Sequence, residues 1–384
     1  MCAQEDKALY GRHYPGLDLV RVTAIAMVML THLSSRAFNL PGGPAQTFIT
    51  WGWHGVDLFF ALSGFLIGGQ IMEQSMTGRF SFRTFYIKRV WRIFPPYYFS
   101  LLVMLTIYAM GAKGYFRLAI HPLATFNDIV RSMAVHIFYL VDYLGSIYDF
   151  QQGIYWSLAV EEQFYILAPL LLYLLVRYGR RLTPWGLGTL ILCGIALRFA
   201  LFSLPAGPGF DWEAAVQRPF HTRFDTLLFG VLAAYLFIKH RDRLATGRAT
   251  RAAVLALSLA SVGASLVFGG FGPGYFNTCW QFTLTGFGFS GLVLWLAVTP
   301  LAGRIRPRRA FNYVARISYP MYLYHLILIR PAYDISTRLF GFNRTSTTQF
   351  FLFFAVYSLV VVFVSGVLYR LVDVPFMNYR KRFV

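Results

Sequence analysis

Long apolar runs recur from one end of this sequence to the other, and they constrain its fold more than any other feature. Each run has 17 or more residues, enough to cross a hydrocarbon core of about 30 Å as a helix. Hydrophobic residues make up 57% of the 384 positions and charged residues only 13%, about half the share of a soluble domain. A water-exposed surface cannot be built from this mixture, so we expect a polytopic membrane protein.

The runs predict an all-α bundle of about ten transmembrane helices. The first run contains Asp18 and Arg21 and lacks a small-x-small cleavage site, so it is interpreted as a retained helix rather than a signal peptide. We expect one transmembrane domain over residues 1–384 and no appended soluble domain. The expected spans are residues 17–35, 51–72, 88–111, 156–176, 185–204, 223–239, 251–269, 278–299, 315–332 and 350–372.

The basic residues between the runs predict the orientation of the chain. A net charge of +19 would suggest nucleic acid for a soluble protein, but here Lys and Arg gather in alternate short loops, and we expect no nucleic-acid partner. Basic loops stay on the cytoplasmic side, so both termini should be cytoplasmic and residues 36–50 and 112–155 external. The apolar stretch 132–145 is short for a crossing, which favours a re-entrant or interfacial helix.

Ionisable residues inside the runs are candidate functional groups, because a charge near the bilayer centre costs about 2.5 kcal/mol or more. Arg21 and His32 lie eleven residues apart, about three helical turns and 16 Å of rise, so they share one face at opposite depths. A snorkelling Arg21 and a His32 satisfied by packing are the alternatives. Further ionisable residues gather at the outer depth of His32: His54, Asp57, Glu161, Glu162, Arg223, Asp225 and His325.

Two chemistries fit these positions. A histidine with a carboxylate partner can accept and return a proton near neutral pH, although each pair has an interhelical ion pair as its alternative. At the cytoplasmic edge, Arg89 and Arg92 are spaced i and i+3, so two guanidinium groups on one helical face can bind phosphate oxygens. A topological or lipid-binding role is the alternative for this arginine pair.

Neither a metal site nor a nucleotide loop is expected. The three cysteines, Cys2, Cys193 and Cys279, have no ligand-like spacing. No strand precedes the glycines in the apolar runs, which therefore indicate close helix packing: Gly64, Gly68, Gly286, Gly288 and Gly291.

Seven ordered segments resemble the membrane acyltransferase family 3, and together they cover nearly the whole chain. They read GLDLVRVTAIAMVMLTHL, GVDLFFALSGFLI, FYIKRVWRIFPPYY, WSLAVEEQFYILAPLLL, HTRFDTLLFGVLAAY, ISYPMYLYHLILI and LVDVPF. The resemblance implies an O-acyltransferase that moves an acyl group, often acetyl from acetyl-CoA, to a hydroxyl of a glycan, lipid-linked sugar or antibiotic. The last motif commonly has Glu before its proline, where this chain has Asp373.

The resemblance also implies roles for individual residues. The family's intramembrane arginine and histidine match Arg21 and His32, and its Arg-x-x-Arg matches Arg89 and Arg92. Glu161 and Glu162 fall in its Trp-Ser-x-x-x-Glu-x-Gln-Phe-Tyr pattern.

Our hypothesis from these patterns is an acyl-CoA dependent O-acyltransferase of the bacterial cytoplasmic membrane, with no permanently bound cofactor. Arg21, Arg89 and Arg92 would bind the phosphates of acyl-CoA. His32 would take the proton of the acceptor hydroxyl, with Glu161 or Glu162 orienting the imidazole or the acceptor.

The acceptor is left open by the sequence. A glycan or lipid-linked sugar is the first choice, with Tyr155 and Trp156 near the outer mouth as stacking surfaces, and a small metabolite such as a macrolide is the second. A proton-coupled transporter is the rival from another class, because intramembrane His, Glu and Asp also build proton relays. No convincing inverted repeat supports transport.

Overall fold

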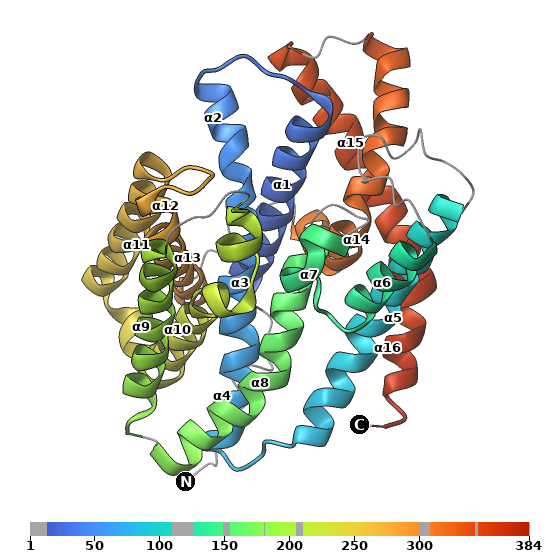
Figure 1. Cartoon of the computed structure of the whole chain (residues 1–384). Coiled ribbons are helices and arrows are strands. Elements are labelled where there is room, and N and C mark those ends of the chain that lie inside the picture. The colour runs from blue at the N-terminus through green and yellow to red at the C-terminus, as the bar shows by residue number, and fades with distance from the viewer. Residues whose placement is uncertain are drawn as a thin grey trace. The chain divides into compact units, whose positions relative to one another are not determined.

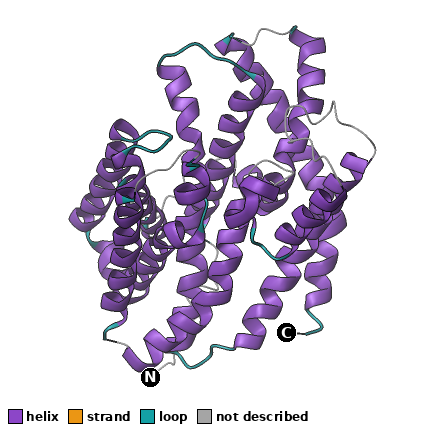
Figure 2. Cartoon of the chain, viewed as in Figure 1, coloured by secondary structure: helices purple, strands orange, loops and turns teal. Residues whose placement is uncertain are grey.

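The computed structural model describes residues 14–109, 126–148, 154–179, 181–204, 210–299, 308–341 and 345–383. Every regular element within these ranges is helical (Figures 1 and 2). The predicted all-α membrane fold is therefore confirmed.

Nine of the described helical segments are long and apolar enough to cross a membrane, and each overlaps an expected span. The tenth expected span, 315–332, lies inside α14 (Arg308–Phe340), which is long enough to cross but less apolar because it is rich in tyrosine and arginine. The nine segments are Pro15–Ala37, Pro44–Met76, Phe82–Ile107, Tyr155–Gly179, Thr183–Ser203, Phe220–Thr246, Arg248–Phe268, Gln281–Val298 and Thr347–Arg380.

The chain divides into two compact units. Unit 1 falls within residues 1–20, 56–80 and 156–306, and its central helix is α10 (Phe220–Thr246), which packs against α9, α11, α13 and η3. Its other helices are α3 (Gly55–Ser63), η3 (Gly64–Gly68), α4 (Gly69–Met76), α8 (Tyr155–Gly179), α9 (Thr183–Ser203), η4 (Glu213–Gln217), α11 (Arg248–Phe268), α12 (Tyr275–Cys279) and α13 (Gln281–Val298).

Glycines bring α3 and η3 against α10 in unit 1. A Cβ atom at Gly64 would collide with the backbone carbonyl of Leu227, and one at Gly230 would collide with that of Ala61. Only glycine lets two helix backbones approach this closely, so the predicted close packing at Gly64 is confirmed. Asp57 lies seven residues before Gly64 and Arg223 seven residues before Gly230. The packing of α3 and η3 on α10 therefore also brings Asp57 and Arg223 together, about two helical turns from the glycine contact.

Unit 2 falls within residues 21–55, 81–155 and 307–384. In this unit α14 packs against α15 and α5, and α16 and the π-helix η6 also pack on α5. The expectation of a single transmembrane domain stays a prediction. The helices of unit 2 are α1 (Pro15–Ala37) from Arg21 onward, α2 (Pro44–Thr50), η2 (Trp51–His54), α5 (Phe82–Ala109), α6 (Phe126–Ile137), α7 (Val141–Tyr148), α14, α15 (Thr347–Leu368), η6 (Tyr369–Asp373) and α16 (Val374–Arg380).

The described part of the connection 112–155 forms two short helices, α6 with 12 residues and α7 with 8. Neither is long enough to cross a hydrocarbon core, which agrees with the expected non-spanning helix. The hydroxyls of Tyr97 and Tyr98 on α5 donate hydrogen bonds to the carbonyls of His136 and Ile137, at 2.9 and 3.1 Å. These bonds fix the end of α6 to α5. Residues 110–125 and 149–153 lie outside the described part.

The orientation of the helices in the membrane can be tested directly. Because basic loops stay in the cytoplasm, reporter fusions at both termini should report the cytoplasmic side, and fusions within 36–50 and 112–155 the opposite side. Paired phosphatase and fluorescent-protein fusions at the same positions make this measurement. A cytoplasmic signal from either loop would contradict the predicted orientation.

Candidate functional site

Two histidines from distant parts of the sequence meet in unit 2. Nδ1 of His32, on α1, lies 2.9 Å from Nε2 of His325, on α14, and the ring centroids are 5.1 Å apart. His325 is fully buried, whereas His32 is partly exposed. The pair therefore joins one partly exposed histidine to one fully buried histidine.

The hydrogen bonds around the pair determine where its protons lie. Nδ1 of His325 is 2.7 Å from the carbonyl oxygen of Tyr322, which can only accept, so this nitrogen carries the hydrogen. Nε2 of a neutral His325 then has a lone pair and accepts from Nδ1–H of His32. In the neutral pair, Nε2 of His32 is left with its lone pair available, which is the state that a general base requires.

Neighbouring hydroxyls hold His325 and Tyr322 in place. The hydroxyl of Tyr357, on α15, donates to the backbone carbonyl of His325 at 3.0 Å. The hydroxyl of Tyr322 donates to the backbone carbonyl of Ile154 at 3.0 Å. Tyr357 and His325 are fully buried, so these bonds are not exchanged with bulk water. The support behind His32 is thus rigid relative to α14 and α15.

Three other predicted residues of unit 2 lie in different surroundings. Arg21 is partly buried on α1, and His54 is buried with its ring stacked on Trp53 at 3.9 Å. Tyr155 is fully buried, and its hydroxyl is hydrogen-bonded to Ser100 at 2.8 Å. Neither face of the Tyr155 ring is exposed in this conformation, and its stacking on an acceptor sugar stays a prediction.

The predicted arginine pair lies about two and three turns into α5. Arg92 is exposed and Arg89 is partly buried, with its guanidinium carbon 5.7 Å from the centre of the Phe85 ring. Both arginines belong to unit 2, as do His32 and His325. Their phosphate-binding role stays a prediction.

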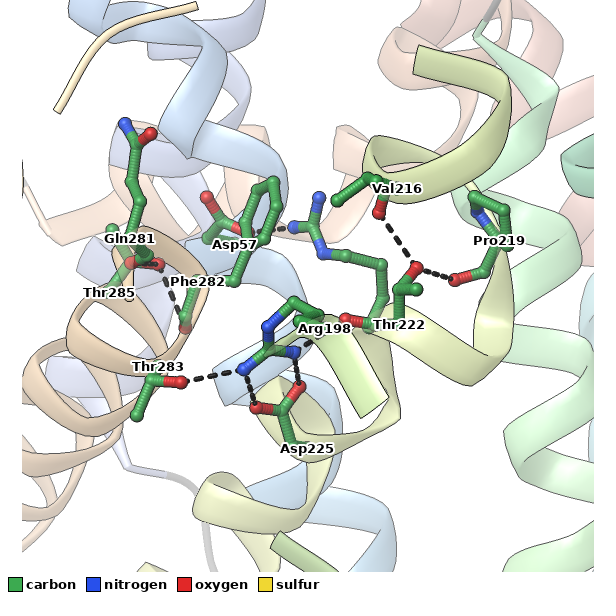
Figure 3. A network of polar contacts seen from close by, with 11 residues as sticks. Asp57, Arg198, Val216, Pro219, Thr222, Asp225, Gln281, Phe282, Thr283 and Thr285 are labelled. Carbon is green, nitrogen blue, oxygen red and sulfur yellow. Dashed lines mark hydrogen bonds and ion pairs between the residues drawn. The ribbon is translucent and has the colours of Figure 1, made fainter. Parts of the chain in front are cut away.

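Unit 1 contains a buried ion pair between Arg198 on α9 and Asp225 on α10 (Figure 3). Two parallel hydrogen bonds of 2.8 and 2.6 Å join the guanidinium to the carboxylate, and both side chains are fully buried. Arg198 also donates to the carbonyl of Thr222 and to the hydroxyl of Thr283, each at 2.6 Å. These bonds fix α9 and α13 to α10, although Nε of Arg198 has no hydrogen-bond partner among the described residues.

A second buried ion pair joins Arg223 on α10 to Asp57 on α3. Arg223 also donates to the carbonyl of Gln217 at 2.8 Å, and its guanidinium carbon lies 3.9 Å from the centre of the Phe282 ring. The Trp156 ring lies 5.5 Å from the same carbon and is buried. For Asp57, Arg223 and Asp225 the structure thus shows interhelical ion pairs. The Trp156 ring packs on Arg223 in this conformation, and its stacking on an acceptor sugar stays a prediction.

The predicted glutamates lie on α8 in unit 1. The hydroxyl of Tyr165 donates to Oε2 of Glu161 at 3.1 Å and is also hydrogen-bonded to Ser63 at 2.5 Å. Glu162 is buried. A carboxylate that oriented the His32 ring would accept a hydrogen bond from its Nδ1, but this nitrogen is bonded to His325 instead. A role for either glutamate in orienting the acceptor stays a prediction.

Sequence reasoning missed two residues of these networks. Arg198 lies near the middle of an apolar run, and the cost of burying an isolated charge there was a sufficient signal. Tyr322 acts through its backbone carbonyl, which no pattern of side chains reveals.

The family comparison agrees with the sequence resemblance. The model of the acyltransferase 3 family, described as an acyltransferase domain, matches residues 14–370. Among curated proteins, the chain is 28% identical over 241 residues to "Putative O-acetyltransferase SACOL0978" of Staphylococcus aureus strain COL, covering 59% of this chain and 35% of that protein. It is also 28% identical over 243 residues to O-acetyltransferase OatA of strain NCTC 8325 / PS 47, covering 60% of this chain and 36% of that protein.

These matches span about a third of the length of each curated relative. No solved structure matches the chain.

Proposed function

The chain belongs to the acyltransferase 3 family, and we propose that it is a membrane O-acyltransferase that moves an acyl group, first of all acetyl, from acyl-CoA to an acceptor hydroxyl. The observation that carries this proposal is the His32–His325 pair, because its hydrogen bonds leave Nε2 of His32 with a lone pair. Relatives named as O-acetyltransferases support the choice of acetyl and of a hydroxyl acceptor.

In the proposed reaction, Nε2 of His32 takes the proton from the acceptor hydroxyl as its oxygen attacks the thioester carbonyl. The new ester C–O bond forms, the C–S bond breaks, and the proton on His32 passes to the departing CoA thiolate. His325 accepts the Nδ1–H hydrogen bond of His32 throughout and stabilises the imidazolium that forms. His32 thus acts as a general base whose ring is oriented by a third group, His325.

The proposed acceptor is a glycan or lipid-linked sugar, with a small hydroxylated metabolite such as a macrolide as the second candidate. The cytoplasmic side is proposed for the donor, since the basic loops are expected there. A bacterial cytoplasmic membrane is the proposed location.

The proposal predicts that purified protein releases free CoA from acetyl-CoA only when a hydroxylated acceptor is present. Thiol release can be followed with a chromogenic disulfide reagent, using lipid-linked sugars extracted from the producing cells as acceptor. A proton-coupled transporter would release no CoA under either condition. Absence of release with every acceptor fraction, from protein that binds CoA, would contradict the proposed transfer.

A further inference from the structure

Three arginines from three helices of unit 2 converge beside the start of α5. Arg92 interacts electrostatically with Arg380 of α16 and with Tyr369 of η6, and Arg316 of α14 interacts with the same tyrosine. The guanidinium of Arg380 is also 3.5 Å from the backbone carbonyl of Lys88, one turn before Arg92. We call Arg92, Arg316 and Arg380 the arginine cluster.

Aromatic packing fixes this convergence. The ring of Trp91 on α5 stacks on Phe376 and Phe383, with centroids 6.0 and 5.7 Å apart, and meets Tyr379 edge-on at 5.0 Å. These contacts hold α16 against α5, next to Arg92 and Arg380. Arg92 and Arg380 are therefore held near one another even though like charges repel.

No described carboxylate lies within ion-pair distance of the arginine cluster, although Asp373 interacts electrostatically with Arg92. Arg92 and Arg316 are exposed and Arg380 is partly exposed. Convergent guanidinium groups without a carboxylate partner form a site for a multiply charged anion such as a phosphate.

A second set of groups lies deeper in the same unit. Asp373 is 6% exposed, and its Oδ2 atom has no hydrogen-bond partner among the described residues. Tyr324 is 4% exposed, and its hydroxyl also has no hydrogen-bond partner among the described residues. Tyr324 interacts electrostatically with Asp373. Buried polar atoms are normally hydrogen-bonded, so a buried carboxylate oxygen and a buried hydroxyl that both lack a partner indicate the place of a polar ligand.

The backbone explains why Asp373 points inward from a strongly apolar helix. Pro375 has no N–H, so the carbonyl four residues earlier loses its helical partner, and the chain forms the π-helix Tyr369–Asp373 between α15 and α16. This insertion changes the register of the helix by one residue. Along α14, Tyr324 stands next to His325 and eight residues beyond Arg316, about 12 Å of helical rise.

We infer that unit 2 holds a two-part donor site, in which the arginine cluster binds the phosphates of acyl-CoA and the Tyr324 and Asp373 side chains hydrogen-bond the amides of its pantetheine arm. The inference rests on the proposed function and adds Arg316, Arg380, Tyr324 and Asp373 to it. The arm carries amide donors and acceptors, which match the unpaired hydroxyl and carboxyl. Tyr324 precedes His325 in the chain, so the arm would lead toward the histidine pair.

The two parts of the site can be separated by two ligands. Binding of CoA and of pantetheine to the full chain in detergent, without acceptor, is measured by calorimetry. Arg316→Gln and Arg380→Gln should raise the Kd for CoA roughly tenfold or more each, because a charged hydrogen bond is lost, and should leave the Kd for pantetheine unchanged. Tyr324→Phe should raise both constants by a similar factor of roughly 3 to 10. Arg370→Gln is the matched control, since Arg370 is exposed on η6 and should change neither.

The binding results distinguish a failure of the donor site from a failure of the proposed function. A wild-type chain that binds no CoA would overturn the proposed function and the donor site with it. Normal CoA binding that none of the variants weakens would overturn the donor site alone. A lipid headgroup is the other source of phosphate: if the arginine variants lose phosphatidylglycerol from nanodiscs while their CoA affinity is unchanged, the cluster binds lipid and the inference fails. Unchanged pantetheine binding by the arginine variants shows that they are folded.

Discussion

Replacing His32 with glutamine should lower kcat for acyl transfer by roughly 10² to 10⁴ fold, the usual contribution of a positioned acid-base group. Glutamine keeps hydrogen bonding and approximate size but cannot accept a proton near neutral pH. CoA binding should be unchanged, because proton removal is needed only when the acceptor attacks. The measurement is the initial rate of CoA release with acceptor, beside calorimetric binding of CoA to the same preparation.

The matched control is His240→Gln, which changes an exposed histidine at the end of α10 and should leave the rate unchanged. His325→Gln should give an intermediate loss, because the acceptor of the His32 Nδ1–H bond changes while the base itself remains. Near-normal turnover by His32→Gln would contradict the assignment. The proton-accepting role would then pass to His325 or to the Glu161 and Glu162 pair.

The second large effect concerns stability rather than catalysis. Asp225→Asn should lower the free energy of unfolding by about 3 to 5 kcal/mol, because it leaves the fully buried guanidinium of Arg198 without its charge partner. The unfolding midpoint in detergent measures the loss. The double variant Arg198→Met with Asp225→Leu should lose less than the sum of the single variants, since no unpaired charge remains buried.

The control for this effect is Arg330→Gln in unit 2. Arg330 and Asp334 form an ion pair of 3.1 Å, but their side chains are 39% and 46% exposed, so its loss should cost only about 0 to 1 kcal/mol. An Asp225→Asn midpoint that matches the Arg330→Gln midpoint would contradict the structural role of the buried pair.

The membrane fold was predictable because length and hydropathy alone determine which segments can cross a bilayer. His32 and His325 were each recognisable as ionisable residues at one depth. Their pairing was not, because they are 293 residues apart and the bond depends on how α1 and α14 pack in unit 2. A carboxylate was the expected partner of His32, since charge patterns favour one, and the structure places an imidazole there instead.

Other parts of the site were not recognisable from the sequence. Arg380 belongs to a basic stretch that the predicted orientation explains, and Arg316 lies within the expected span 315–332, where it was not singled out. Their convergence on Arg92 becomes visible only when α5, α14 and α16 are packed. Tyr155 and Trp156 were expected near the outer mouth as stacking surfaces for sugars, with a membrane aromatic belt as the alternative. Both are buried, since the same rings also fill the space around the polar side chains of the interior.

Removal of the acceptor hydroxyl's proton by His32 during acyl transfer can be tested by following the acetyl label into the acceptor. Purified chain is incubated with radiolabelled acetyl-CoA and the lipid-linked sugars of its own cells, and the label in the sugar fraction is counted before and after mild alkali, which cleaves esters and leaves amides. We expect alkali-labile label with the wild type and with His240→Gln, and almost none with His32→Gln. Equal alkali-labile label with His32→Gln, or alkali-stable label with the wild type, would contradict this expectation.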